Sequence, residues 1–133
     1  MVNGAKHTVK TPKNSTYRPH KKLDAWQKSI DLTVSIYELT KCLPDDEKFG
    51  LISQMRRASV SISCNIAEGA ARNSKKEFKQ FLYISLGSLS ELDTLLVICE
   101  ELKLLKSKSV EEITNKIVDL SKLISGLINY TKR

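Results

Sequence analysis

The chain has 133 residues, of which 41% are hydrophobic and 28% are charged, and its formal net charge is +7. The length is that of one ordinary domain, and this balance of apolar and charged residues is typical of a globular protein with a single core. No run of about 18 apolar residues occurs and the N-terminus has no apolar segment, so we expect a cytoplasmic protein without a membrane span or a secretory signal.

Residues 1–22 hold most of the net charge. They contain six basic residues and no acidic one, whereas the other 111 residues contain 16 basic and 15 acidic residues. The segment is polar, has two prolines and shows no apolar period, so it is predicted to be a disordered tail. It is either a solubilising extension or an arm that binds phosphate groups. In the second case its candidate nucleic-acid contacts are Lys6, Lys10, Lys13, Arg18, Lys21 and Lys22.

Residues 23–133 are predicted to form an all-α, antiparallel up-down four-helix bundle. Five glycines and three prolines are too few for the turns of a β-sandwich, and the apolar residues recur at helical spacing. The first helix is expected over 23–40, with a core face of Leu23, Trp26, Ile30, Val34 and Tyr37 and with Leu32, Ile36 and Leu39 beside it. The short connections between four long helices favour the up-down topology.

The other helix boundaries follow from local signals. The second helix is expected from about Asp45, because acidic residues suit the positive end of a helix, to about Gly69. Capping boxes at Ser74–Glu77 and Ser109–Glu112 predict the starts of the third and fourth helices. The third is expected to end near Leu102. The predicted core face of the fourth contains Val110, Ile113, Ile117, Leu120, Ile124 and Leu127.

The two central helices have more apolar surface than one bundle face requires. The third helix has a core face of Phe78, Phe81, Leu82, Leu89, Leu92, Leu96 and Cys99, and a second stripe of Ile84, Leu95, Ile98 and Leu102. The second helix has small residues opposite its core face, namely Val60, Cys64, Ala67 and Ala71. A monomer would leave these stripes in water, so we expect a homo-oligomer. The alternative is that both helices are buried on several sides within one bundle.

An acidic residue, Glu91, falls within the second stripe of the third helix. A buried carboxylate needs a cation, and Arg56 and Arg57 are the nearest candidates by wheel position. Glu68 lies on the same polar strip as Arg57, so the candidate structural ion-pair residues are Arg56, Arg57, Glu68 and Glu91. The pair is expected within one chain or between subunits, and the alternative is a charged pocket for a ligand.

No pattern for catalysis occurs: GxGxxG, GxxxxGK, HExxH and GxSxG are all absent. Both histidines, His7 and His20, lie in the tail, so the predicted core has none for acid–base chemistry or metal binding. We therefore expect a protein that is not an enzyme and that has no catalytic residue, cofactor or metal site. Three cysteines at wide spacing are predicted to be buried thiols.

A basic cluster marks the expected turn between the second and third helices. It consists of Arg72, Lys75, Lys76 and Lys79. These residues are candidate phosphate contacts, and the alternative is an ordinary solvated surface.

The stretch between Phe49 and Glu91 resembles the family of small four-helix bundle proteins encoded within intervening sequences of bacterial 23S ribosomal RNA genes. The matching pieces are Gly50-Leu51, Gln54, Arg56-Arg57-Ala58, Ser61, Asn65 to Gly69, Arg72, Glu77, Phe81-Leu82, Gly87-Ser88 and Glu91. Cys64 and Leu86 depart from the family pattern. The resemblance covers about 22–130, and it implies an up-down bundle that assembles as a ring-like homopentamer. It also implies a relation to the accessory proteins of diversity-generating retroelements, which are basic pentamers that bind reverse transcriptase and RNA.

These observations together predict a non-enzymatic, oligomeric helical-bundle protein that binds structured RNA through basic surface residues. Its expected partners are further copies of itself, RNA and a protein partner, and no membrane. The competing hypothesis is a protein-interaction scaffold without nucleic-acid binding, in which the tail serves only solubility. Salt-dependent RNA binding distinguishes the two, because phosphate contacts weaken steeply with salt.

Overall fold

The computed structural model describes His20 and residues 23–133. The helices of this part are α1 (Asp24–Thr40), α2 (Leu51–Ala70), α3 (Lys75–Glu101) and α4 (Ser107–Thr131), and a short 3₁₀ turn, η2 (Asp45–Glu47), precedes α2. The described residues contain no strand, which confirms the all-α class. Apart from His20, the predicted tail lies outside the described residues, as do its candidates Lys6, Lys10, Lys13, Arg18, Lys21 and Lys22.

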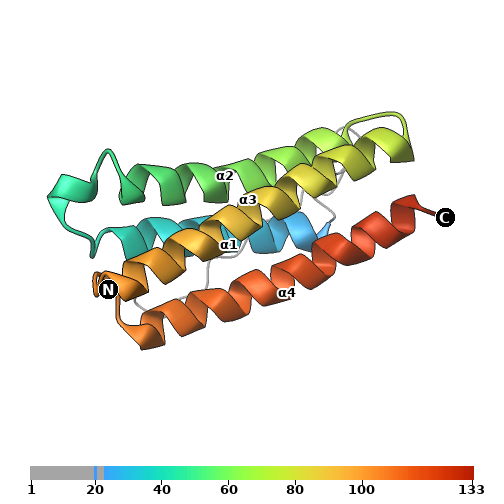
Figure 1. The fold of residues 1–133 in the computed structure, drawn as a ribbon. Coiled ribbons are helices and arrows are strands. Elements are labelled where there is room, and N and C mark those ends of the chain that lie inside the picture. The colour runs from blue at the N-terminus through green and yellow to red at the C-terminus, as the bar shows by residue number, and fades with distance from the viewer. Residues whose placement is uncertain (1–19, 21–22) are drawn as a thin grey trace.

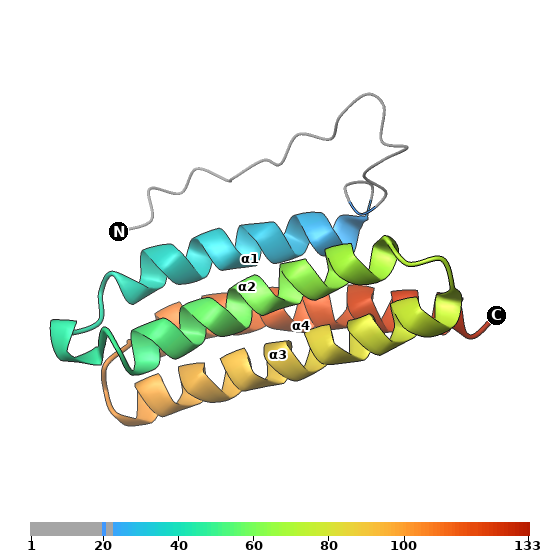
Figure 2. The same ribbon diagram turned by 90° about the horizontal axis from the view of Figure 1, so that it is seen from above.

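Each helix packs against the one before it in the chain, and α4 also packs against α1. Figures 1 and 2 show the four helices side by side along their lengths. The start of α1, the α2–α3 connection and the end of α4 lie at one end of the molecule. The other two connections lie at the opposite end, so residues far apart in the sequence meet at each end.

Aliphatic side chains from all four helices form one core. The largest fully buried ones are Leu32, Ile36, Met55, Ile62, Ile66, Leu82, Leu92, Leu96, Leu120 and Ile124. Each such side chain contributes about 1.5–3 kcal/mol by leaving water. The core positions predicted for α3 and α4 are confirmed, except that Phe78, Phe81 and Leu127 are half-buried.

The face of α1 that enters the core differs from the predicted one. The buried residues are Ala25, Ser29, Leu32, Ile36 and Thr40, whereas Val34 and Tyr37 of the predicted stripe are exposed and Leu23, Trp26 and Ile30 are half-buried. Ser29 and Thr40 can be buried on this face because each hydroxyl makes a hydrogen bond within α1. Ser29 donates to Trp26 O, and Thr40 donates to Ile36 O. The apolar stripe alone was therefore the wrong guide to the buried face.

Two predicted helix starts also change. The acidic residues from Asp45 form η2, and α2 begins only at Leu51. The fourth helix begins at Ser107, where Lys106 is the N-cap residue without a side-chain hydrogen bond, so the predicted cap at Ser109 is wrong. At α3 the predicted start is confirmed, because Ser74 Oγ accepts from Glu77 N at 3.2 Å. The Glu77 carboxylate accepts from the Ser74 hydroxyl instead of a backbone donor.

Candidate functional site

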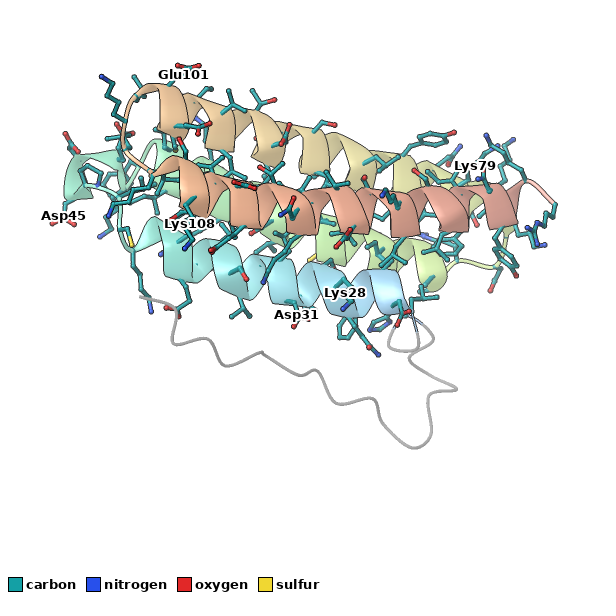
Figure 3. All side chains as sticks on the ribbon, turned by 90° about the horizontal axis from the view of Figure 1, so that it is seen from below. Lys28, Asp31, Asp45, Lys79, Glu101 and Lys108 are labelled. Carbon is teal, nitrogen blue, oxygen red and sulfur yellow. The ribbon has the colours of Figure 1, made fainter. Side chains whose placement is uncertain are left out.

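The α2–α3 turn presents the basic cluster Arg72, Lys75, Lys76 and Lys79 at one end of the molecule. The first three side chains are exposed and Lys79 is half-buried. Figure 3 shows Lys79 at this end and Asp45 and Glu101 at the opposite one. The start of α3 adds the partial positive charge of a helix N-terminus. The turn therefore has a net positive charge, because its four basic residues outnumber the exposed Glu68 and Glu77.

Close packing of α2 against α3 holds this turn in place. A Cβ atom at Gly69 would lie 2.8 Å from Phe81 Cβ, 2.9 Å from Phe78 Cδ1 and 3.3 Å from Phe78 O. No side chain fits there without a shift of α3. Gly69 thus allows the end of α2 and the start of α3 to approach closely just before the basic cluster.

Arg72 is held by neighbours on both helices. Its Nη2 donates to Glu68 Oε1 at 2.8 Å, and its guanidinium lies 4.9 Å from the centroid of the Phe81 ring. Both partners of the ion pair are exposed, so the pair adds little stability. It does offset part of the positive charge of Arg72. Glu68, predicted as an ion-pair residue, therefore pairs with Arg72.

Lys75 of the basic cluster contacts the end of α4. Its Nζ lies 4.6 Å from the centroid of the Tyr130 ring. The two residues border a pocket of about 470 Å³ at this end. Its lining includes Leu23, Arg72, Lys75, Phe78, Leu127 and Tyr130. Because Lys22 is joined directly to Leu23, the predicted tail is attached beside this pocket.

Sequence reasoning did not identify Tyr130 and Phe78 as site residues. A signal for Tyr130 was available, because an up-down bundle places the end of its fourth helix beside the turn between the second and third. Lys132 and Arg133 follow Tyr130 and extend the positive surface. The opposite end has a mixed charge, because η2 and the α3–α4 connection bring Asp45, Asp46, Glu47, Glu100 and Glu101 together with Lys103, Lys106 and Lys108.

Glu91 is not buried within the chain, which corrects the predicted intrachain ion pair. It is exposed on α3, and Arg57 is exposed on α2. Within the described part, the ion pairs are Lys41–Glu38 and Arg72–Glu68. Arg56 instead turns toward α1: its Nε donates to Thr40 Oγ1 at 2.9 Å, and its guanidinium lies 4.5 Å from the Tyr37 ring centroid. Wheel position placed Glu91 among apolar residues, but Ile84 and Ile98 of that stripe are exposed too.

The second apolar stripe of α3 is largely exposed. Ile84, Ile98 and Leu102 are exposed, whereas Leu95 belongs to the core. On α2, the small-residue face is open as well, with Val60, Cys64 and Ala71 exposed and Ala67 half-buried. Burial within one bundle, the alternative explanation of these stripes, therefore applies to Leu95 but not to the exposed residues.

A second surface feature lies between α1 and α2. A groove of about 750 Å³ is lined by residues that include Tyr37, Phe49, Ile52, Arg56, Arg57 and Val60. Phe49, at the entry to α2, is 91% exposed. An apolar ring this exposed is unusual for a surface that contacts only water.

The cysteines divide into two classes. Cys42 and Cys64 are exposed and Cys99 is buried, so the prediction of three buried thiols is wrong for two of them. Burial raises the pKa of the Cys99 thiol, and the negative charge of Glu47 raises it further.

No group of three or more His, Cys, Asp or Glu residues among the described ones could hold a metal ion. By length and composition, α3 is the one helix in the described ranges that could cross a membrane, and 33% of its apolar stretch is buried. The core helix of a soluble protein passes the same test, so the absence of a membrane span stays a prediction.

Residues 21–126 match the family model described as 23S rRNA-intervening sequence protein. The chain is also similar to a solved structure described as a protein with unknown function from the S23 ribosomal protein family, from Bacteroides thetaiotaomicron. The two are 28% identical with a TM-score of 0.73, and the match covers 78% of this chain and 97% of that one. No curated protein matches the chain.

Proposed function

From its membership of the 23S rRNA-intervening sequence protein family, we propose that this chain is a non-enzymatic, cytoplasmic, oligomeric helical-bundle protein that binds structured RNA. The contacts are the basic cluster Arg72, Lys75, Lys76 and Lys79 at the α2–α3 turn, together with the basic residues of the N-terminal segment. Family membership supports the helical-bundle fold, and the charge distribution supports RNA as the ligand.

The single observation that carries this proposal is the concentration of positive charge at one end of the bundle. Residues 23–133 are close to neutral as a whole, yet the turn cluster and the C-terminal Lys132 and Arg133 lie together at the end where the basic N-terminal segment is attached. Phosphate groups respond to local charge, because each contact releases counterions from the nucleic acid. A locally basic end suits RNA better than an evenly mixed surface does.

The proposed assembly is an antiparallel up-down bundle that forms a homopentamer. Four residues connect α2 to α3 and five connect α3 to α4, and connections this short favour antiparallel neighbours. The exposed stripe of Ile84, Ile98 and Leu102 supports self-association, because a second copy would remove it from water. An ion pair between Glu91 and Arg57 of different subunits fits the same contact, since both residues are exposed.

A protein-interaction scaffold is the second candidate function. The exposed Phe49 beside the groove between α1 and α2 favours it, because aromatic residues next to arginine are frequent in protein–protein contacts. In this case RNA binding would be absent, and the positive charge of the N-terminal segment would serve only solubility.

The test is the salt dependence of RNA binding by the full-length protein. Fluorescence anisotropy with a labelled RNA hairpin, between about 50 and 200 mM salt, should show a linear fall of log affinity with log salt. The triple variant Lys75→Gln, Lys76→Gln, Lys79→Gln should reduce the slope by about 2, since each lost contact to a single strand removes about 0.7. Replacing the six basic residues before Leu23 with Gln should reduce it separately.

The matched control is the triple variant Lys103→Gln, Lys106→Gln, Lys108→Gln at the opposite end, which removes the same charge. It should leave the slope close to that of the unmodified protein. Equal effects of the two triples would contradict a basic-end contact. Absence of RNA binding at every salt concentration would contradict the RNA proposal and favour the scaffold.

A further inference from the structure

The pocket at the basic end combines apolar surface, an aromatic ring and cations. The half-buried Leu23, Phe78 and Leu127 supply the apolar part, and the exposed Arg72, Lys75 and Tyr130 supply the cations and the ring. These residues come from α3, from α4, from the α2–α3 connection and from the residue before α1, and Gly69 and Ala70 at the end of α2 complete the lining. The pocket therefore exists only when the four helices are assembled.

Tyr130 offers a ring face to a ligand. The residue is 49% exposed, and the Lys75 ammonium group lies over the ring at 4.6 Å from its centroid. Lysine side chains are flexible, so Lys75 can move away from the ring of this half-exposed tyrosine. A planar base can take the place of the Lys75 ammonium group over the ring. Lys75 is then free to contact the phosphate group of the same nucleotide.

The rest of the lining suits the polar parts of a nucleotide. Asn73 and Ser74, which also line the pocket, supply an amide and a hydroxyl for the edge of a base. Arg72 is held against Glu68 and Phe81, so its guanidinium is positioned before any ligand arrives. Apolar side chains beside the ring exclude water from a stacked base.

We infer that this pocket binds one unpaired nucleotide of an RNA, with its base stacked on Tyr130 and its phosphate neutralised by Lys75. The inference rests on the proposed RNA binding and narrows it. A base inside a duplex is already stacked on both sides and cannot reach a side-chain ring, whereas a base in a loop can be splayed out. The protein therefore prefers RNA with unpaired nucleotides over a fully paired duplex.

The experiment compares two labelled RNAs with equal numbers of phosphates, a hairpin with an unpaired loop and a blunt duplex. Anisotropy with full-length protein should give tighter binding of the hairpin. Tyr130→Leu should weaken hairpin binding about ten-fold, as expected for the loss of one base–aromatic stack, and leave duplex binding unchanged. Tyr130→Phe should retain hairpin binding, because stacking requires the ring and not the hydroxyl.

Tyr83→Leu is the matched control, because Tyr83 is 50% exposed but lies outside the pocket lining. It should leave both affinities unchanged. A loss of duplex and hairpin binding by the same factor in Tyr130→Leu, or an equal effect of the two tyrosine variants, would overturn the pocket while leaving RNA binding intact. Failure of the unmodified protein to bind either RNA would overturn both proposals.

A second measurement needs no variant and covers the case in which Tyr130→Leu does not fold. A hairpin with 4-thiouridine in its loop is cross-linked to the unmodified protein, which is then digested with trypsin. The cross-link should map to the peptide of residues 123–132, which contains Tyr130. Cross-links confined to peptides before Leu23 would contradict a loop nucleotide in this pocket.

Discussion

Gly69 is the residue whose replacement best tests the packing beneath the basic cluster. In Gly69→Ala the new Cβ would stand under 3.0 Å from atoms of Phe78 and Phe81. Overpacking of this kind costs about 1–3 kcal/mol, which exceeds the gain of about 1 kcal/mol in helix propensity. Thermal unfolding followed by circular dichroism should show a Tm several degrees lower.

Gly87 and Gly126 provide the controls, because a Cβ at either position meets nothing within 4 Å. Gly126→Ala and Gly87→Ala should each raise the Tm slightly through helix propensity alone. Should Gly69→Ala prove as stable as these two, the close approach of α2 and α3 would be incorrect.

Cys99 is predicted to be the unreactive thiol of the protein. The thiolate is the species that attacks a thiol reagent, and burial raises the pKa of Cys99 so that little thiolate forms near pH 8. A variant with Cys42→Ser and Cys64→Ser should react with a thiol-specific chromogenic reagent only after denaturant is added. The complementary variant Cys99→Ala should react without denaturant, and rapid reaction of Cys99 in the native protein would contradict its burial.

At the level of elements, the start of α3 and the start of α4 differ in how they are stabilised. Ser74→Ala removes the acceptor of the Glu77 N–H and should lower the free energy of unfolding by about 1 kcal/mol. Ser109→Ala should change it by less than about 0.5 kcal/mol, because Ser109 lies inside α4 and caps nothing. Urea unfolding of the two variants measures both values, and an equal loss would return Ser109 to the capping role that its sequence pattern suggested.

The same capping pattern, a serine followed three residues later by a glutamate, occurs at Ser74 and Ser109 but caps only α3. Helix α4 begins two residues before Ser109, at Ser107. Val110 is buried, and the chain enters the helix early enough to place it in the core. The burial of Val110 therefore had more influence on where α4 begins than a side-chain cap at Ser109, which would contribute about 1 kcal/mol.

For the whole molecule, the exposed stripe of α3 predicts assembly. Light scattering should give about five times the chain mass of 15.0 kDa for the unmodified protein. Ile98→Glu places a charge in the stripe and should give smaller species, whereas Val118→Glu on α4 should leave the mass unchanged. The two positions are matched, since Ile98 is 39% and Val118 42% exposed.

Circular dichroism should show native helix content in both variants, so that a change in mass reports association and not unfolding. A monomeric unmodified protein at micromolar concentration would contradict the proposed pentamer. A pentamer insensitive to Ile98→Glu would place the interface elsewhere, with the groove beside Phe49 as the next surface to substitute.

The four helices, the core faces of α3 and α4, and the capped start of α3 could be predicted from the amino-acid sequence. These features depend on spacing along one helix or on contacts between residues three apart, which a sequence pattern records directly. The basic cluster at the α2–α3 turn was visible for the same reason, because its members lie within eight residues of each other.

The features that depend on neighbouring helices could not be predicted from the sequence, because they arise from contacts between residues far apart in the chain. In α1 two faces were available, and packing against α2 and α4 selected the one with Ala25, Leu32 and Ile36. Glu91 is exposed in the single chain because no other helix of the chain covers this part of α3, which a helical wheel cannot report. Tyr130 meets Lys75 from 55 positions away, and that contact exists because the end of α4 packs beside the start of α3.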